Sequence, residues 1–85
     1  MHNVRIISSA QKDLDGLDKK FFGPIQQRIV ALASDPRPAG CLKLTAQEGY
    51  RIRSGDYRIL YRIDDGEKVV YIYRIKHRKE SYRNA

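Results

Sequence analysis

The most informative part of the chain is Tyr50-Arg51-Ile52-Arg53-Ser54-Gly55-Asp56-Tyr57-Arg58-Ile59-Leu60-Tyr61-Arg62. Arginines alternate with tyrosines and aliphatic residues on both sides of a Ser-Gly-Asp turn, a pattern that predicts two short strands joined as a hairpin. Because side chains on a strand alternate between faces, Arg51 and Arg53 share one face, and so do Arg58 and Arg62. A sheet that fixes guanidinium groups on one side is suited to binding phosphates.

Strand patterns continue on both sides of this hairpin. Residues 41–44 are compatible with a short strand, and residues 68–76 form the most apolar strand, which we expect in the centre of the sheet. The turn between the last two strands, Asp64-Asp65-Gly66-Glu67, is a strong hairpin signal. Its length stays open. Two or four turn residues would place Arg58 on the face of Tyr71 and Tyr73, whereas three or five would align it with Arg74.

The first half of the chain predicts an opening strand and two helices. Residues 3–8 form the strand, and Ser8 or Ser9 can cap a helix that continues to about Leu17. The second helix is expected to begin near Pro24, because proline suits a first helical turn, and to end before residues 35–38. The predicted fold class is α+β, with an N-terminal strand, a helical hairpin and an antiparallel sheet of three to four strands. The helices pack on one face of that sheet, in a single domain over residues 1–85.

Charge is concentrated in the strand-rich half. The chain of 85 residues has a net charge of +7, and its last 35 residues carry ten Lys or Arg against five Asp or Glu. Such a domain is expected to bind a polyanion such as RNA, DNA or an acidic protein, although a basic but inert surface is the alternative. No membrane span or signal peptide is expected, and a lone Cys41 gives no disulfide or metal site. We therefore expect a cytoplasmic protein without metal or cofactor.

Two motifs carry a family resemblance that extends over the whole chain. They are the hairpin segment from Arg51 to Tyr61 and the terminal segment His77-Arg78-Lys79-Glu80-Ser81-Tyr82. With the preceding strand and helical hairpin, they closely resemble the RelE/ParE superfamily of type II toxin–antitoxin toxins, and the RelE branch in particular. The resemblance implies a RelE-like toxin domain that cleaves messenger RNA in the ribosomal A site through attack by the ribose 2′-hydroxyl. It also implies a cognate acidic antitoxin as partner.

The resemblance assigns roles to individual residues. Arg58 corresponds to the arginine that orients the phosphate, Arg78 to the arginine that assists the leaving group or the transition state, and Tyr82 to the tyrosine that stacks on a base. Arg51 and Arg53 match a basic pair that is lysine in the best-studied RelE pattern. Since arginine stays charged, these two can hold phosphate but are poor general bases.

The remaining candidates follow from residue chemistry. Histidine is the residue type suited to proton transfer near neutral pH, and His77, beside the cluster, is therefore the candidate for that role. Arg62, Arg74 and Lys76 complete the predicted RNA-binding set. The alternative for each of these cations is a solvated charge or a cross-strand ion pair without a functional role. Tyr71 is expected in the core. Two other functions stay open: a ParE-like DNA gyrase inhibitor without nuclease activity, and a non-catalytic RNA- or DNA-binding module.

Overall fold

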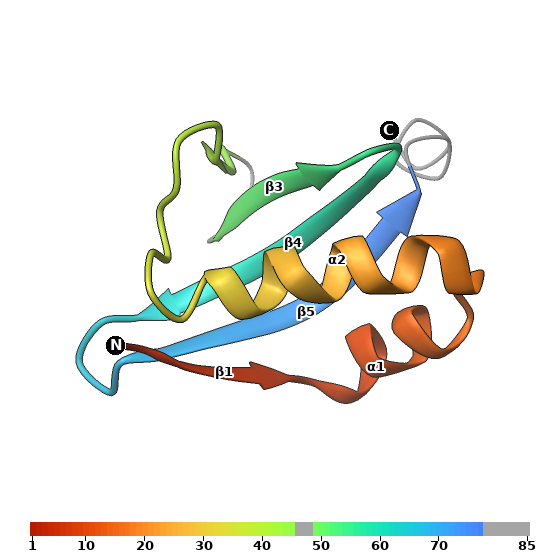
Figure 1. Cartoon of the computed structure of the whole chain (residues 1–85). Coiled ribbons are helices and arrows are strands. Elements are labelled where there is room, and N and C mark those ends of the chain that lie inside the picture. Colours follow the sequence, from red (N-terminus) through yellow and green to blue (C-terminus); the bar gives the residue numbers. More distant parts are fainter. Residues whose placement is uncertain (46–48, 78–85) are drawn as a thin grey trace.

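The computed structural model describes residues 1–45 and 49–77. In chain order the elements are β1 (Asn3–Ile6), α1 (Ser8–Asp15), α2 (Lys19–Ala31), β2 (Leu42–Lys43), β3 (Tyr50–Ser54), β4 (Tyr57–Asp64) and β5 (Val69–His77). Figure 1 shows α2 lying across the strands and α1 at one end of the sheet. None of the helices in these residues is long and apolar enough to cross a membrane.

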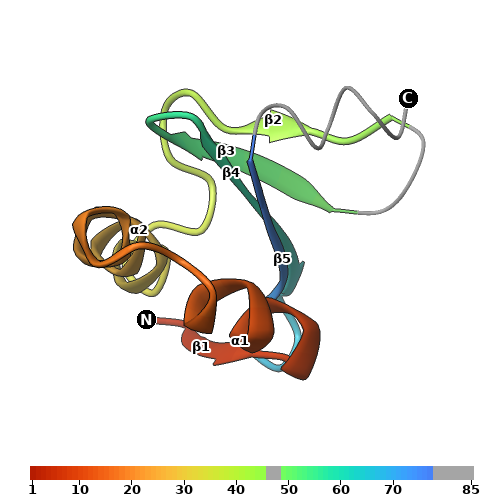
Figure 2. The ribbon, with the colours of Figure 1, turned by 90° about the vertical axis from the view of Figure 1, so that its right-hand side faces the viewer.

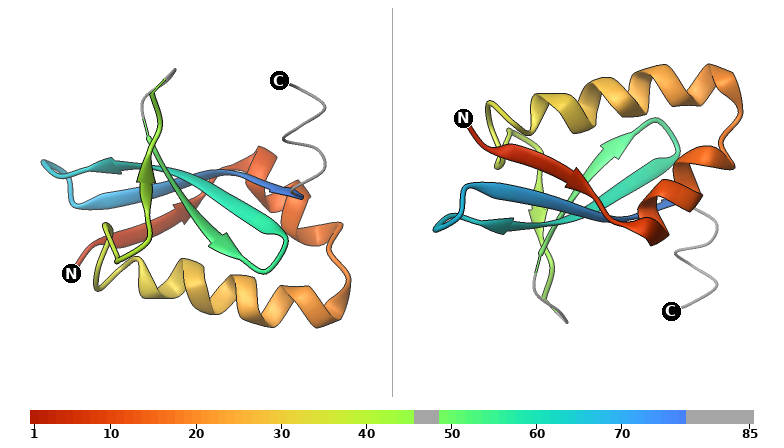
Figure 3. Two further views of the ribbon diagram at one scale, coloured as in Figure 1. Left: turned by 90° about the horizontal axis from the view of Figure 1, so that it is seen from above. Right: turned by 90° about the horizontal axis from the view of Figure 1, so that it is seen from below.

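The five strands form one sheet in the order β1-β5-β4-β3-β2. Strands β2 to β5 are antiparallel, whereas β1 pairs in parallel with β5. The views in Figures 2 and 3 show both helices on the same side of this twisted sheet. The predicted α+β class, the helical hairpin and the antiparallel strands after it are therefore confirmed. The parallel position of β1 adds a fifth strand beside β5.

Helix α1 is anchored to the sheet by a side chain that we expected to cap it. The residue before its first turn is Ile7, and neither serine makes a side-chain capping bond, so the capping prediction was wrong. Ser9 instead donates its hydroxyl hydrogen to the carbonyl of Tyr73 at 2.6 Å. Ala10 and Leu14, one turn apart, are buried and place the helix against the core.

Helix α2 begins at Lys19 and contains Pro24, so the predicted start near Pro24 was wrong. A proline at this position removes one backbone hydrogen bond, to the carbonyl of Lys20, and Lys20 is an exposed residue, so water can take the place of that bond. The extra turn is held at its start by the amides of Phe21 and Phe22, which donate to the carbonyl of Asp18. The Phe21 ring also packs on Tyr57, with centroids 5.2 Å apart.

The hydrophobic core lies between the helices and one face of the sheet. Its members are Ala10, Leu14, Ile25, Ile29, Leu32, Ile52, Ile59, Tyr61, Val70, Ile72 and Ile75. All the sheet residues in this set point toward the helices. The opposite face of the sheet carries mainly polar and charged side chains, with Leu60 and Val69 as buried apolar residues among them.

Candidate functional site: the basic face of the sheet

The faces of β5 are decided by a β-bulge. Near the turn, Arg62 lies opposite Tyr71, but further along Leu60 lies opposite Arg74 and Arg58 opposite Lys76. Tyr73 is the extra residue between these two halves. The four-residue connection between β4 and β5 alone would have put Arg58 on the face of Tyr71 and Tyr73. The bulge exchanges the two faces of β5 beyond Tyr73. Tyr71 therefore shares the face of Arg58 near the turn, and Arg74 shares it beyond the bulge, so each alternative left open by the sequence holds in one half of the hairpin.

The registers place seven cations on the sheet face that points away from the helices. We call this surface the basic face, and it carries Arg5, Arg51, Arg53, Arg58, Arg62, Arg74 and Lys76. Six of the seven are residues that the sequence analysis selected. The alternation on β3 and β4 is as predicted, since Ile52, Ile59 and Tyr61 point to the core instead. The structure thus brings the predicted arginines of β3, β4 and β5 together on one surface.

Three cations lie side by side across the middle of this face. Arg53 on β3 is opposite Arg58 on β4, and Arg58 is opposite Lys76 on β5. Neighbouring strands are about 4.8 Å apart, so the three side chains start within about 10 Å of one another. Cations from three neighbouring strands can contact the oxygens of one phosphate together. Arg53 and Arg58 also line a shallow cavity of about 210 Å³ beside the Gly55 turn.

The adjacent row contains Arg51, Leu60 and Arg74. Asp13 of α1 accepts hydrogen bonds from Arg74 Nε at 3.0 Å and from the backbone amide of Ile75 at 2.8 Å. This carboxylate reaches the edge of β5 where β1 no longer pairs with it, because the β1–β5 ladder stops at Ile72. Arg74 is therefore held at the rim of the basic face by an ion pair.

His77 lies on the other side of the sheet. It is opposite Tyr57, and the two rings meet edge to face with centroids 5.1 Å apart. Tyr57 in turn contacts Phe21 of α2, so this ring pair belongs to the helix-covered side. The register therefore places the imidazole of His77 on the opposite face of the sheet from the row of Arg53, Arg58 and Lys76. Arg78 and Tyr82 lie outside the described residues.

Three residues were not assigned to the basic face from the sequence: Arg5, Tyr71 and Tyr73. Arg5 lies opposite Tyr71, which lies opposite Arg62. Tyr71 was expected in the core because it shares sequence parity with Ile75, and the bulge makes that expectation wrong. Tyr73 reaches toward Gly49, and burial raises the pKa of its phenol. A parallel strand and a bulge leave no local sequence signal from which these positions could be read.

A polar cluster braces the end of the sheet near the β4–β5 turn. Arg37 forms a two-point ion pair with Asp65, at 3.3 and 2.9 Å, and donates from Nε to the Tyr50 hydroxyl at 3.2 Å. The Arg37 guanidinium holds the pKa of the Asp65 carboxyl below its usual range. Tyr61 donates its hydroxyl hydrogen to the carbonyl of Pro36 at 2.8 Å, and burial raises the pKa of Tyr61. These contacts fix the segment after α2 against β3, β4 and the turn between β4 and β5.

Comparison with known proteins agrees with this architecture. Residues 4–82 match the family model described as the ParE toxin of the type II toxin–antitoxin system parDE. The chain belongs to the RelE/ParE family of type II toxins. It is 34% identical to the toxin RelE of Mycobacterium tuberculosis over 96% of this chain and 87% of that one. It is 32% identical to the toxin RelG of the same organism, over 96% and 97%.

Solved structures also resemble this chain and agree with its membership of the RelE/ParE family. The RelBE2 toxin–antitoxin complex of Mycobacterium tuberculosis has a chain that superposes with a TM-score of 0.80 at 31% identity, covering 91% of this chain and 98% of that one. The archaeal RelE–RelB complex of Pyrococcus horikoshii has a chain that superposes with a TM-score of 0.77 at 29% identity, over 91% and 94%. The relatives with RelE and RelG names place this toxin in the RelE branch.

Proposed function

We propose that this toxin is a ribosome-dependent messenger RNA endonuclease. The observation that supports the proposal best is the row of Arg53, Arg58 and Lys76 across three strands. Attack of a ribose 2′-hydroxyl on the adjacent phosphate passes through a phosphorane with added negative charge. The bond from phosphorus to the 5′-oxygen of the next nucleotide then breaks, which leaves a cyclic phosphate, and the proton lost by the 2′-hydroxyl is balanced by one taken up by the 5′-oxygen. Cations held by a rigid sheet stabilise that charge without reorganising, and arginine can bind two phosphate oxygens at once.

The described residues favour charge stabilisation over proton transfer. The central row contains two arginines and a lysine, and an arginine does not act as a base near neutral pH. His77 has its ring against Tyr57 on the helix side, so we give it no role in the chemical step. Family resemblance adds Arg78 for the leaving group and Tyr82 for base stacking. A site of this kind cleaves free RNA slowly and gains from a ribosome that aligns the message for in-line attack. Such an activity belongs in the cytoplasm.

The test is cleavage of a message on translating ribosomes. Wild-type toxin is expected to cut in the A site, and Arg58→Ala should lower the rate by roughly 10²–10³-fold, the loss typical of a charge-stabilising donor. The matched control is Arg28→Ala, because Arg28 is an exposed arginine on α2, on the helix side of the sheet. Unchanged cleavage by the Arg58→Ala variant refutes the proposal.

A gyrase-directed activity is the second candidate, because the matching family model carries the ParE name. Inhibition of DNA supercoiling by gyrase, with no cleavage of ribosome-bound messages, would establish that function instead. Salt-sensitive RNA binding without either activity would leave only a binding module. The same preparation of protein serves all three assays.

We also propose a cognate acidic antitoxin as partner. Support comes from the two solved relatives above, which are toxin–antitoxin complexes, and from the charge of +7 on this chain. An acidic segment that folds on the toxin would be drawn to it by long-range attraction. The association rate with the antitoxin should therefore fall as salt rises. Stopped-flow rates that do not change with salt would contradict this steering.

A further inference from the structure

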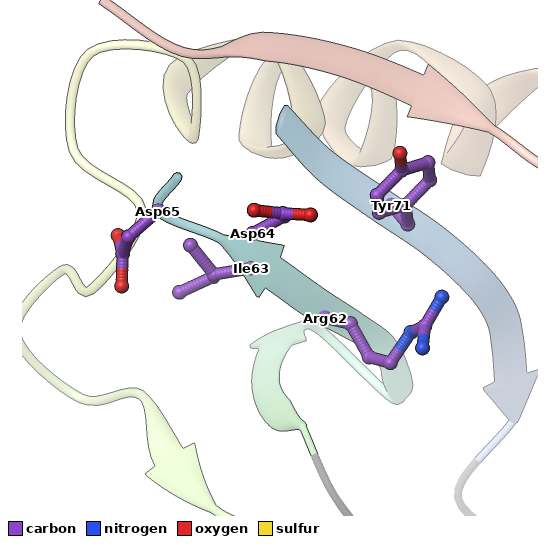
Figure 4. Close-up of a pocket in the computed structure, with 5 residues that line it drawn as sticks. All are labelled: Arg62, Ile63, Asp64, Asp65 and Tyr71. Carbon is purple, nitrogen blue, oxygen red and sulfur yellow. The ribbon is translucent and has the colours of Figure 1, made fainter. Parts of the chain in front are cut away.

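The basic face continues beyond the Arg58 row into a second hollow of different chemistry. A cavity of about 250 Å³ is lined by Arg62, Ile63, Asp64, Asp65 and Tyr71. Figure 4 shows Arg62, Asp64 and Tyr71 around the same space, with Arg62 and Asp64 on β4 and Tyr71 on β5. Arg62 is four positions along β4 from Arg58, which corresponds to about 13 Å. The hollow therefore lies beyond the nucleotide whose phosphate Arg58 would hold.

The lining side chains are held in place by interactions within the protein. The Arg62 guanidinium lies 5.5 Å from the centre of the Tyr71 ring, a cation–π contact that favours this arrangement of the two groups. Asp64 accepts a hydrogen bond from the amide of Glu67 through Oδ1 at 2.9 Å, which orients its carboxylate. Among the described residues, no hydrogen bond reaches Asp64 Oδ2. Asp65, by contrast, is engaged by both terminal nitrogens of Arg37.

This mixture of groups does not suit a phosphate, since two carboxylates line the hollow. It suits a flat ligand with hydrogen-bond acceptors on one edge and donors on another. Arg62 offers only donors and Asp64 only acceptors. Guanine presents the O6 and N7 acceptors to an arginine, and its N1–H and N2–H donors to a carboxylate. Adenine would turn its N6 amino group toward the arginine and its N1 lone pair toward the carboxylate.

We propose that the hollow between Arg62, Asp64 and Tyr71 is a guanine-selective subsite for a nucleotide neighbouring the one at Arg58. In it Arg62 donates to O6 and N7, Asp64 accepts from N1–H and N2–H, and Tyr71 supplies an aromatic wall. This inference rests on the proposal that the basic face binds RNA. It adds a preference for base identity, which the Arg53, Arg58 and Lys76 row cannot provide because phosphates carry no sequence information.

The first test measures binding without ribosomes. The probes are two fluorescent heptanucleotides of uridine, one with a central guanine and one with a central adenine. Wild-type protein should bind the guanine probe roughly tenfold more tightly. Asp64→Asn should bring the ratio close to one, because an amide offers both a donor and an acceptor. The control Asp15→Asn makes the same change of charge on α1, where the carboxylate contacts only Gln11 among the described residues, and should keep the ratio.

The second test maps cuts on ribosome-bound messages of random sequence. Guanine should be enriched at one fixed position relative to the cut by wild-type protein, and the cuts made by the Asp64→Asn variant should lack that enrichment. Equal binding of the two probes, or cut sites without guanine enrichment, overturns the subsite and leaves the nuclease proposal intact. Guanine-selective binding with no cleavage on ribosomes supports the subsite and refutes the nuclease.

Discussion

Replacing Asp13 by alanine tests how the basic face is attached to the rest of the fold. The Asp13 carboxylate is 22% exposed and accepts two hydrogen bonds, from the amide of Ile75 and from Arg74 Nε. With Ser9, which binds the carbonyl of Tyr73, it replaces the strand partner that β5 lacks beyond Ile72. Alanine at this position leaves a backbone amide and a guanidinium without their acceptor.

The magnitude follows from the two bonds. A backbone bond contributes about 1 kcal/mol, and a bond between charged groups about 1.5 kcal/mol when one partner is half exposed, as Arg74 is. Asp13→Ala should therefore lower the free energy of unfolding by about 2–3 kcal/mol. In a domain of this size that corresponds to a fall of about 10–20 °C in Tm. Asp13→Asn keeps an acceptor for Ile75 and should cost about 1 kcal/mol.

The assay is urea unfolding followed by circular dichroism, with thermal melts in parallel. Asp15→Ala on the same helix is the control and should stay within about 0.5 kcal/mol of wild type, because its bond to Gln11 is exposed. In an Arg74→Ala background, the effect of Asp13→Ala should shrink by the contribution of the ion pair. If Asp13→Ala is no more harmful than Asp15→Ala, α1 does not secure the edge of β5.

Four further outcomes are expected. A Cβ at Gly49 would lie 2.7 Å from the Tyr61 carbonyl oxygen on a backbone with φ of +131°, so Gly49→Ala should cost at least about 2 kcal/mol in urea unfolding. Gly23→Ala, which meets nothing within 4 Å inside α2, should be neutral or stabilising. Because its folded pKa is raised, Tyr61 contributes stability that is present below pH 10 and is lost as pH rises further, and Tyr61→Phe should flatten this alkaline loss in unfolding experiments. The pKa of Asp65 is lowered, so its contribution is present above the usual carboxyl range and disappears as acid protonates it, and Asp65→Asn should weaken the acid dependence of Tm.

The central hairpin could be predicted because its information is local. Alternation with period 2 assigns Arg51, Arg53 and Arg58 to one face, and the two-residue turn after Ser54 preserves that alternation across the hairpin. The start of α2 could not be predicted from Pro24 alone. Packing of Phe21 on Tyr57 favours an earlier start of α2. At the exposed residue Lys20, water can replace the hydrogen bond that Pro24 cannot donate.

The sequence by itself determined the fold class, the concentration of charge on the last strands and the faces of β3 and β4. Only the tertiary structure decided which side of β5 joins them and what lies at the edges. One bulge residue, Tyr73, reverses the faces of β5, and the parallel pairing of β1 brings Arg5 beside Tyr71. The parallel pairing joins segments more than sixty residues apart in the chain, whereas the bulge lies in the pairing of β4 with β5, and the carbonyl of its extra residue accepts a hydrogen bond from Ser9. Periodicity shows which residues alternate along a strand, but only the pairing between strands sets where that alternation shifts.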